Sequence, residues 1–366
     1  MSFLTHFSDV SDPRSHINVK HDFLDVVFLT VSAILSGAEG WNDIECFGRD
    51  KLTWLKQYRD FENGIPVDDT IARIIRVICP KQLNQAFLNW VNEIRVETGK
   101  PQIAIDGKTL RHSYDGDKQT ALHSITAWSK DAGIVLAQLK SSGKKNEHAS
   151  VLEMLDTLDI KGALISADAM NSQKKIVDKI HAKQADYVLC IKNNQKSLKD
   201  EIQAYFHKVQ RDTPEFIAQA EHTDTGHGRI EVRRCQQLLV NEWISEAKHW
   251  SGIRSVVKLE RERHVEGKPS TSETQYYISS LGIDPKAVSQ AIRSHWEVEN
   301  KVHWVLDVAY KEDDCRIRKE DGAENVGVIR RFCLNMARLH PKKASMRGKL
   351  KMAGWGDDFR SELIFG

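Results

Sequence analysis

The chain has 366 residues, of which 40% are hydrophobic and 28% are charged, and its formal net charge at pH 7 is +2. These are the values of an ordinary globular protein with room for two or three domains. Because the chain as a whole is close to neutral, it is not a polycation, and any contact with nucleic acid has to come from local basic patches.

The sequence predicts neither a membrane span nor a secreted protein. The longest apolar run near the start, residues 26–35, is interrupted by Thr30 and Ser32 and is too short to cross a bilayer. The first residues lack the basic segment of a signal peptide. The six cysteines contain no Cys-x2-Cys pair, so they indicate neither a zinc knuckle nor a disulfide framework. We therefore expect a cytoplasmic protein with reduced thiols and no membrane partner.

Residues 1–98 predict a helical N-terminal module. Apolar residues recur at helical spacing between Phe23 and Ile34 and again between Ile71 and Ile78. The opposite face of the second helix carries arginines. Two interpretations stay open at this point: a DNA-binding module, or an ordinary helical bundle whose arginines are merely solvated.

Residues 99–208 predict alternating strands and helices. Three antiparallel strands are followed by helices that alternate with parallel strands, which matches a ribonuclease H-like arrangement. The fold class that we expect is therefore α/β, with a mixed sheet covered by helices. The strands are predicted at residues 103–105, 121–128, 133–139, 163–167 and 187–191, and the helices at 148–158, 172–182 and 197–207.

Residues 209–282 predict a β-rich insertion that interrupts this core. Basic residues cluster here, Arg229 among them, either to contact DNA or as the solvated face of a sheet. A helix is expected only at residues 243–250. The extended segments lie at residues 229–240, 252–262 and 274–281.

Residues 283–340 are expected to complete the catalytic core. Asp284 and Pro285 start a helix, as N-cap and first helical residue, and this helix continues to about Asp307. Residues 341–366 are rich in lysine and arginine, and we expect them to form a basic C-terminal tail.

Asp106 and Asp168 directly follow two predicted strands. In a ribonuclease H-like sheet those strands are neighbours, so the carboxylates would face each other, which is unfavourable unless cations bridge them. Carboxylate oxygens suit Mg²⁺ or Mn²⁺, and two such ions would serve phosphoryl transfer. A local explanation also stays open, because Asp106-Gly107 is a common hairpin signal and Asp168 could simply end its strand in a turn.

A third carboxylate is expected from the helix after the insertion, where Glu297 and Glu299 compete. At about 100° per residue, Glu299 falls on the apolar stripe and Glu297 on the opposite face. A glutamate on a buried stripe needs a partner, which makes Glu299 the better candidate. It could instead be a carboxylate paired with His295 or His303. These two histidines and Glu299 also have the spacing of a transition-metal site, but no cysteine or further histidine cluster supports zinc.

Seven ordered motifs resemble the H-repeat-associated proteins of Rhs elements, which are insertion-sequence transposases of the DDE type. The resemblance extends over nearly the whole chain. The motifs are GIPVDDT at residues 64–70, IDGK at 105–108, ADAMNSQ at 167–173, KNNQ at 192–195, HGRIE at 227–231, YISSL at 277–281 and HWEVENKVHWVLD at 295–307.

This resemblance implies a ribonuclease H-like core with a β-strand insertion, and a transposase that cuts and joins DNA. The family's DDE triad falls on Asp106, Asp168 and Glu299, as catalytic residues and as ligands of Mg²⁺ or Mn²⁺, two ions in all. The implied partners are double-stranded DNA, at element ends and target, and further copies of the chain when the ends are synapsed. The residues expected to contact DNA are Lys108, Arg111, Lys192, Asn194, Gln195, Arg229 and His295.

The helix around Glu299 departs from the pattern Tyr-x2-Arg-x3-Glu-x6-Lys of the wider group of DDE transposases with a β-insertion. Only Glu299 is kept, and the other three positions hold Ile292, His295 and Leu306. Which residues contact flanking DNA therefore stays open, and Lys301 or Arg293 could take the phosphate-contacting role from a shifted position. Two alternatives to an active transposase stay open: a catalytically inactive, domesticated DNA-binding relic, and a stand-alone nuclease of the same fold.

Overall fold

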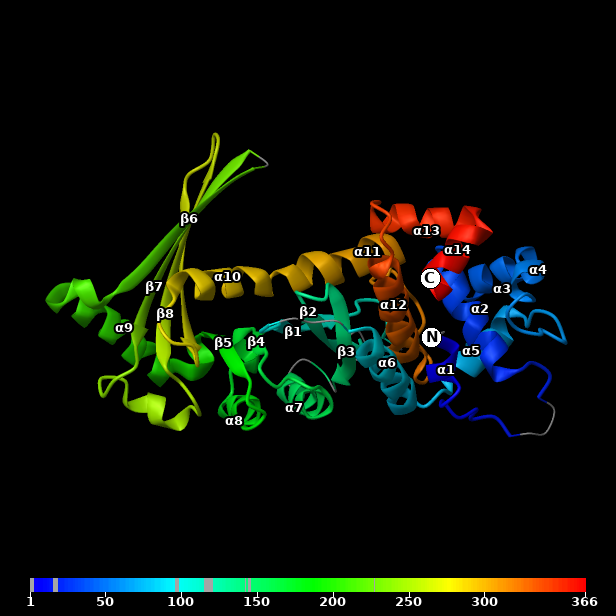
Figure 1. Cartoon of the computed structure of the whole chain (residues 1–366), viewed down its shortest axis with the longest axis horizontal. Coiled ribbons are helices and arrows are strands. Elements are labelled where there is room, and N and C mark those ends of the chain that lie inside the picture. The colour runs from blue at the N-terminus through cyan, green and yellow to red at the C-terminus, as the bar shows by residue number, and fades with distance from the viewer. Residues whose placement is uncertain are drawn as a thin grey trace.

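The computed structural model describes residues 3–15, 19–95, 99–114, 121–141, 143, 146–226 and 228–366. They form an elongated molecule in which one mixed sheet carries a strand arm at one end and a group of helices at the other (Figure 1). His227, the first residue of the motif HGRIE, lies outside the described residues. No helix in the described ranges is long and apolar enough to cross a membrane.

A nine-stranded sheet of order β3-β2-β1-β4-β5-β9-β8-β7-β6 organises the fold. β1 runs antiparallel to β2 and parallel to β4, and β4 runs parallel to β5. All other neighbours are antiparallel. The strands are β1 Gln102–Thr109, β2 His123–Ser129, β3 Ile134–Ser141, β4 Leu164–Ala167, β5 Asp186–Ile191, β6 Ala218–Gly226, β7 Arg229–Leu239, β8 Ser255–Val265 and β9 Thr271–Ser279.

The part of the sheet that will carry the site, β1 to β5, is held by buried apolar side chains. Ile105, Ile165 and Leu189, one on each of its three parallel strands, are at most 1% exposed. Because these strands are covered on their faces, they read as short continuous apolar runs in the sequence. The helices between and after them are α7 Glu147–Thr157, α8 Lys174–Ala182 and α9 Lys196–Asp212. They begin within two residues of the predicted positions, but α9 continues five residues beyond its predicted end.

The four strands β6 to β9 do not form a separate sheet. β9 pairs with β5, with Leu189 opposite Ile278, so all four strands continue the sheet beyond β5. Their far ends make the arm that rises from the molecule in Figure 1. The segment at residues 243–250, for which we expected a helix, forms only a 3-10 turn, η6 Ser245–His249.

Helices make up the other end of the molecule. Helix α12, Gly322–Leu339, is buried along almost its whole length and contacts β3 as well as α2, α5 and α6. It therefore joins the sheet to the N-terminal helices. Those helices are α1 Phe3–Phe7, α2 Phe23–Leu35, α3 Trp41–Asp50, α4 Leu52–Leu55, α5 Asp68–Arg76 and α6 Pro80–Ile94.

The expectation that residues 341–366 form a tail was wrong. They fold into α13 Met346–Trp355 and α14 Asp357–Phe365, which pack against α2 and α12. Leu350 and Leu363 are buried in this contact. Even Lys349 is buried, and its ammonium donates to the backbone oxygens of Ala337 and His340 at 2.7 and 2.8 Å. The basic composition concealed two amphipathic helices.

The helix predicted to continue from residue 284 to about 307 is interrupted. α10, Pro285–His295, is followed by a π-helical turn, η7 Glu299–His303, and then by α11, Trp304–Tyr310. A π-helical turn closes hydrogen bonds over five residues instead of four, so it rotates every following side chain relative to a regular helix.

A fully buried ion pair ties α12 to the sheet. Arg331 Nη1 donates to Glu312 Oε1 at 2.7 Å, and neither side chain is exposed. Lys108 on β1 lies 3.3 Å from the other oxygen of Glu312. Burial by itself would raise the pKa of Glu312, but the charges of Arg331 and Lys108 outweigh it and lower that pKa to about 2. Glu312 is therefore a carboxylate that needs both cations.

We predict that Glu312→Ala destabilises the protein by about 3–5 kcal/mol, because it leaves Arg331 buried without its counter-ion. Chemical denaturation of the purified chain measures this change. The control is Glu362→Ala on α14, which removes a 61% exposed partner of His340 and should cost less than about 1 kcal/mol. Equal effects of the two variants would contradict the prediction.

Candidate active site

Asp106 and Asp168 lie where two parallel strands separate. The β1–β4 ladder pairs Ile105 with Ala167, so the two aspartates are the next residues in register. The expectation that their strands are neighbours is confirmed. The expectation that Asp106 ends its strand was wrong, because β1 continues to Thr109 against β2.

Asp168 also has the local role that its position suggested. It caps the 3-10 turn η3, Ala169–Asn171, and its Oδ1 accepts hydrogen bonds from the backbone N and from Nδ2 of Asn171, both at 3.1 Å. These two donors hold one oxygen of the carboxylate in place. Capping of a turn and a place in the site are therefore compatible for this residue.

Burial makes both aspartates costly to ionise. It raises the pKa of Asp106 to about 6, and of the nearby charges His303 opposes the rise while Asp168 adds to it. Burial also raises the pKa of Asp168, against the hydrogen bonds from Asn171. Two carboxylates in a poorly solvated place repel each other unless a cation lies between them. The arrangement therefore favours a bound cation.

Glu299 reaches the same cavity from the π-helical turn. Its side chain is 57% exposed, so the expectation that it lies on the buried stripe was wrong. The π-helical turn breaks the regular count of about 100° per residue on which that expectation rested. The expected pairing with His303 is present: Nδ1 of His303 lies 3.0 Å from Oε2 of Glu299. This hydrogen bond lowers the pKa of Glu299.

His303, expected as a possible partner of Glu299, also contacts Asp106, and this second contact was not expected. Its Nδ1 lies 3.5 Å from Oδ2 of Asp106 as well as close to Glu299. Possible ligand atoms of Asp106, Glu299 and His303 all lie within 4.8 Å of one another, the one such group of three found in the described ranges. The only sequence signal for His303 was its spacing of four residues from Glu299.

His295 points elsewhere. Its Nδ1 hydrogen-bonds with Oγ of Ser166 on β4 at 3.2 Å, and burial lowers its pKa to about 4, so the ring is neutral at pH 7. It lines the same cavity as the carboxylates but does not join their ligand group. The spacing of His295, Glu299 and His303 therefore does not gather a zinc site.

Two neighbouring hollows surround this cluster. The smaller has a volume of about 200 Å³ and holds Asp106, Asp168 and Glu299. The larger has about 560 Å³ and shares a wall with the first that includes Trp296, whose side chain is exposed. The expected DNA-contact residue Arg229 lines the larger pocket.

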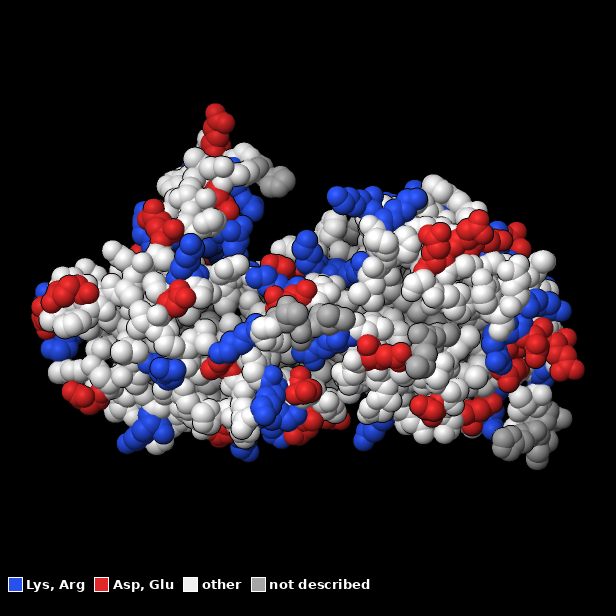
Figure 2. Space-filling model, viewed as in Figure 1, with Lys and Arg blue, Asp and Glu red and all other residues white. Residues whose placement is uncertain are grey.

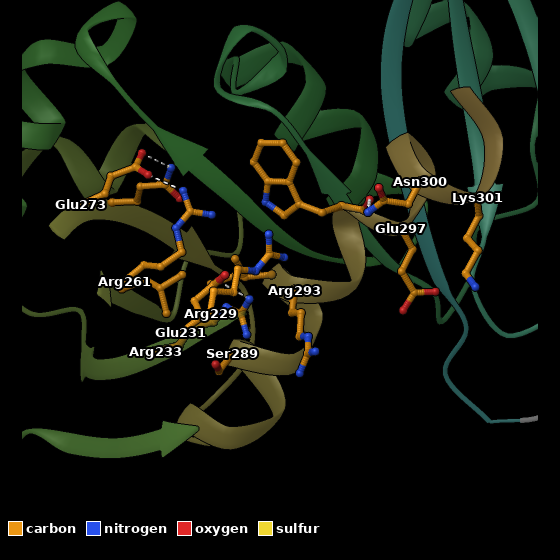
Figure 3. Close-up of a pocket in the computed structure, with 14 residues that line it drawn as sticks. Arg229, Glu231, Arg233, Arg261, Glu273, Ser289, Arg293, Glu297, Asn300 and Lys301 are labelled. Carbon is orange, nitrogen blue, oxygen red and sulfur yellow. Dashed lines mark hydrogen bonds and ion pairs between the residues drawn. The ribbon is translucent and has the colours of Figure 1, made fainter. Parts of the chain in front are cut away.

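The larger pocket is rich in cations (Figure 3). The strands of the arm supply Arg229 and Arg261, and the helical segment supplies Arg293 and Lys301. Part of this positive charge is neutralised within the pocket, because Glu273 pairs with Arg261. The pocket therefore offers guanidinium groups and an aromatic surface directly beside the carboxylates.

Three expected DNA-contact residues lie after β5. Lys192 lines the carboxylate cavity. The amide of Asn194 donates to the backbone oxygen of Ala169 at 2.6 Å, and that of Gln195 to Ser172 at 3.1 Å. In this structure the two amides hold the turn that follows Asp168.

The cations after Asp106 are engaged by carboxylates. The side chain of Lys108 is buried, and its ammonium contacts Asp307, Glu312 and Asp313, so in this structure it does not present a free charge to DNA. The expectation that Lys108 contacts DNA stays a prediction. Arg111 is exposed and lies 3.3 Å from Asp313.

We predict that Asp106→Asn stabilises the protein in the presence of a chelator. The folded-state pKa of Asp106, about 6, exceeds its ordinary value of 3.8. The free energy of unfolding of the wild type is therefore highest while this carboxyl group is protonated, and it falls as the pH rises through that range. At about 1.4 kcal/mol per pKa unit, the gain near pH 8 should approach about 3 kcal/mol and disappear below about pH 4.

Denaturation at both pH values measures this difference. The control is Asp156→Asn, because Lys179 lowers the pKa of Asp156 and neutralising it should give no gain. If Asp106→Asn is no more stable than the wild type near pH 8, the claim that ionised Asp106 destabilises the folded protein is wrong.

The chain matches two family models. A model described as DDE_Tnp_1-associated matches residues 4–91, and the model of the transposase DDE domain matches residues 97–336. A solved structure of the piggyBac transposase synaptic complex with hairpin DNA aligns with a TM-score of 0.43 at 10% identity, over 99% of this chain and 77% of that chain.

Two curated relatives that are named as putative transposases are similar to this chain over most of its length. The H repeat-associated putative transposase YhhI of Escherichia coli (strain K12) is 38% identical over 99% of this chain and 97% of its own. The putative transposase YncI of Escherichia coli O157:H7 is 40% identical over 92% of this chain and 87% of its own. The chain therefore belongs to the DDE-domain transposases and is similar to their H repeat-associated members.

Proposed function

We propose that this chain cuts the ends of an insertion-sequence-like element and transfers the freed 3′-OH to target DNA, with Asp106, Asp168 and Glu299 as its catalytic carboxylates. One observation carries the proposal. Asp106 and Asp168 are the first residues beyond the paired part of β1 and β4, and Glu299 lines the same cavity. Membership of the DDE-domain family supports the same three residues.

We assign β1 to β5 to a ribonuclease H-like core. Its support is the strand order 3-2-1-4-5, with β1 antiparallel to β2 and parallel to β4. In this division residues 99–208 and 283–340 form the core, 209–282 the β-insertion and 1–98 the helical module. Residues 341–366 join the helical module instead of forming a tail, because α13 and α14 pack against α2.

The carboxylates fit divalent cations, and we propose two ions of Mg²⁺ or Mn²⁺ held by Asp106, Asp168 and Glu299. The fit rests on the oxygen donors and on the raised pKa of both buried aspartates. Bound divalent cations would activate water and stabilise the negative charge that develops on the phosphate. The protein's own part is to hold three carboxylates around one cavity and to exclude bulk water from the two aspartates.

Double-stranded DNA is the proposed substrate and the proposed partner. Figure 2 shows a hollow between the strand arm and α13, and lysine and arginine side chains gather on both of its sides and along its floor. Exposed cations of these elements include Arg229 on β7, Arg293 on α10 and Arg347 on α13. A duplex in this hollow would pass over the carboxylate cavity, with its phosphates against these groups. Synapsis of two ends would require a homo-oligomer.

The test is cleavage of DNA that carries the element's own ends, with and without Mg²⁺. We expect cleavage by the wild type, none with a chelator, and losses of about 1,000-fold, or about 4 kcal/mol in activation free energy, for Asp106→Asn, Asp168→Asn and Glu299→Gln. The matched control is Glu297→Gln on the same helical segment, which should retain activity.

If Asp106→Asn cleaves these DNA ends as fast as the wild type, the assignment of the catalytic residues is wrong. Salt-sensitive binding of the ends without any cleavage by the wild type would identify the chain as a DNA-binding relic of a transposase. Cleavage of branched DNA irrespective of the end sequence would indicate a structure-selective nuclease.

A further inference from the structure

A buried carboxylate that the proposed function does not use lies behind the site. Glu147, the first residue of α7, is 3% exposed. Its Oε2 lies 2.9 Å from Nε2 of His123 on β2, and its Oε1 accepts a hydrogen bond from Nδ2 of Asn171 at 2.6 Å. Both oxygens are thus engaged, which a buried carboxylate requires.

His123 and Asn171 extend this contact in opposite directions. Nδ1 of His123 lies 2.9 Å from Oγ1 of Thr109, so a neutral ring that donates from Nε2 to Glu147 and accepts from Thr109 satisfies all three groups. On the other side, Nδ2 of Asn171 also donates to Oδ1 of Asp168 at 3.1 Å. One amide group therefore connects the carboxylate of Glu147 to that of Asp168.

The residue after Asp106 makes room for this network. A Cβ atom on Gly107 would lie 2.7 Å from Nε2 of His123 and 2.8 Å from Oε1 of Glu147, which is closer than real Cβ contacts. Only glycine at this position lets the histidine and the glutamate pack directly against β1. The network is thus built into the strand that carries Asp106.

We propose that Glu147, together with His123 and Asn171, is a positioning residue for the divalent metal site: it holds Asn171 so that Oδ1 of Asp168 is fixed, and it adds a negative charge behind the two aspartates. The proposal rests on the proposed function. Groups behind metal ligands that fix their orientation commonly change metal affinity by about 10–100-fold when they are removed. Glu147 would do so without touching substrate or metal.

Two variants separate its charge from its hydrogen bond. In Glu147→Gln the side-chain oxygen can still accept from Asn171, and His123 can accept from the new amide by changing tautomer, so only the charge is lost. Asn171→Ala keeps the charge and removes the bridge to Asp168. The control is Glu324→Gln, a buried glutamate of α12 whose partner is Lys140 at 3.7 Å.

The experiment measures Mn²⁺ binding to the full chain without DNA, by calorimetry or by the spin resonance of free Mn²⁺, and thermal unfolding alongside. We expect Glu147→Gln and Asn171→Ala each to weaken binding by about 10–100-fold. The double variant should bind more weakly than either single variant, because it loses both the charge and the bridge to Asp168. The unfolding temperature of Glu147→Gln should be no lower than that of the wild type, because the variant removes a negative charge that acts on both aspartates. The affinity of Glu324→Gln should match that of the wild type. Raising the Mn²⁺ concentration should restore cleavage by Glu147→Gln, which a merely structural defect would not allow.

Two failures can be told apart. If the wild type binds Mn²⁺, Asp106→Asn weakens the binding, and both Glu147→Gln and Asn171→Ala bind as tightly as the wild type, the positioning role is overturned and the metal site stands. If the wild type binds no Mn²⁺ and Asp106→Asn changes nothing, the metal-dependent function fails, and the role of Glu147 fails with it.

Discussion

Repulsion between carboxylates at one end of the parallel strands is the constraint on which the rest of the structure depends. Asp106 and Asp168 are brought together by the register of β1 and β4, and Glu147 lies behind them. Burial of the two aspartates raises the pKa of each. Hydrogen bonds from Asn171 to Asp168 and the contact of His303 with Asp106 relieve part of this repulsion, and a divalent cation would relieve the rest.

Glu312 is a buried carboxylate whose negative charge is neutralised by cations of the chain itself. Glu312 is more deeply buried than the site carboxylates, but Arg331 and Lys108 contact it and lower its pKa to about 2. At Asp106 the pKa is raised to about 6 instead, and within the described ranges its carboxylate has an ion-pair contact only with the imidazole of His303. Lys108, two residues from Asp106, is directed away to Glu312. The difference between the clusters lies in whether the chain supplies its own cations.

The remaining architecture places polar and cationic surfaces around this constraint. Pairing of β9 with β5 extends the sheet into an arm, and α10 lies against its strands. Glu299, the first residue of the π-helical turn between α10 and α11, is largely exposed and lines the cavity. The C-terminal helices complete the opposite side of the hollow seen in Figure 2. Segments far apart in the sequence thus meet around one place.

Local pattern and resemblance together determined the family, the order of strands and helices from residue 99 to 208, and the neighbouring positions of Asp106 and Asp168. A strand that is buried on both faces consists of consecutive apolar residues, so the sequence itself shows where such a strand lies and which carboxylate follows it. Tertiary structure alone decided the exposure of Glu299, the place of His303, the helices of residues 341–366 and the diversion of Lys108. These depend on contacts such as that between Lys108 and Glu312, 204 residues apart, and on a π-helical turn that no regular periodicity indicates.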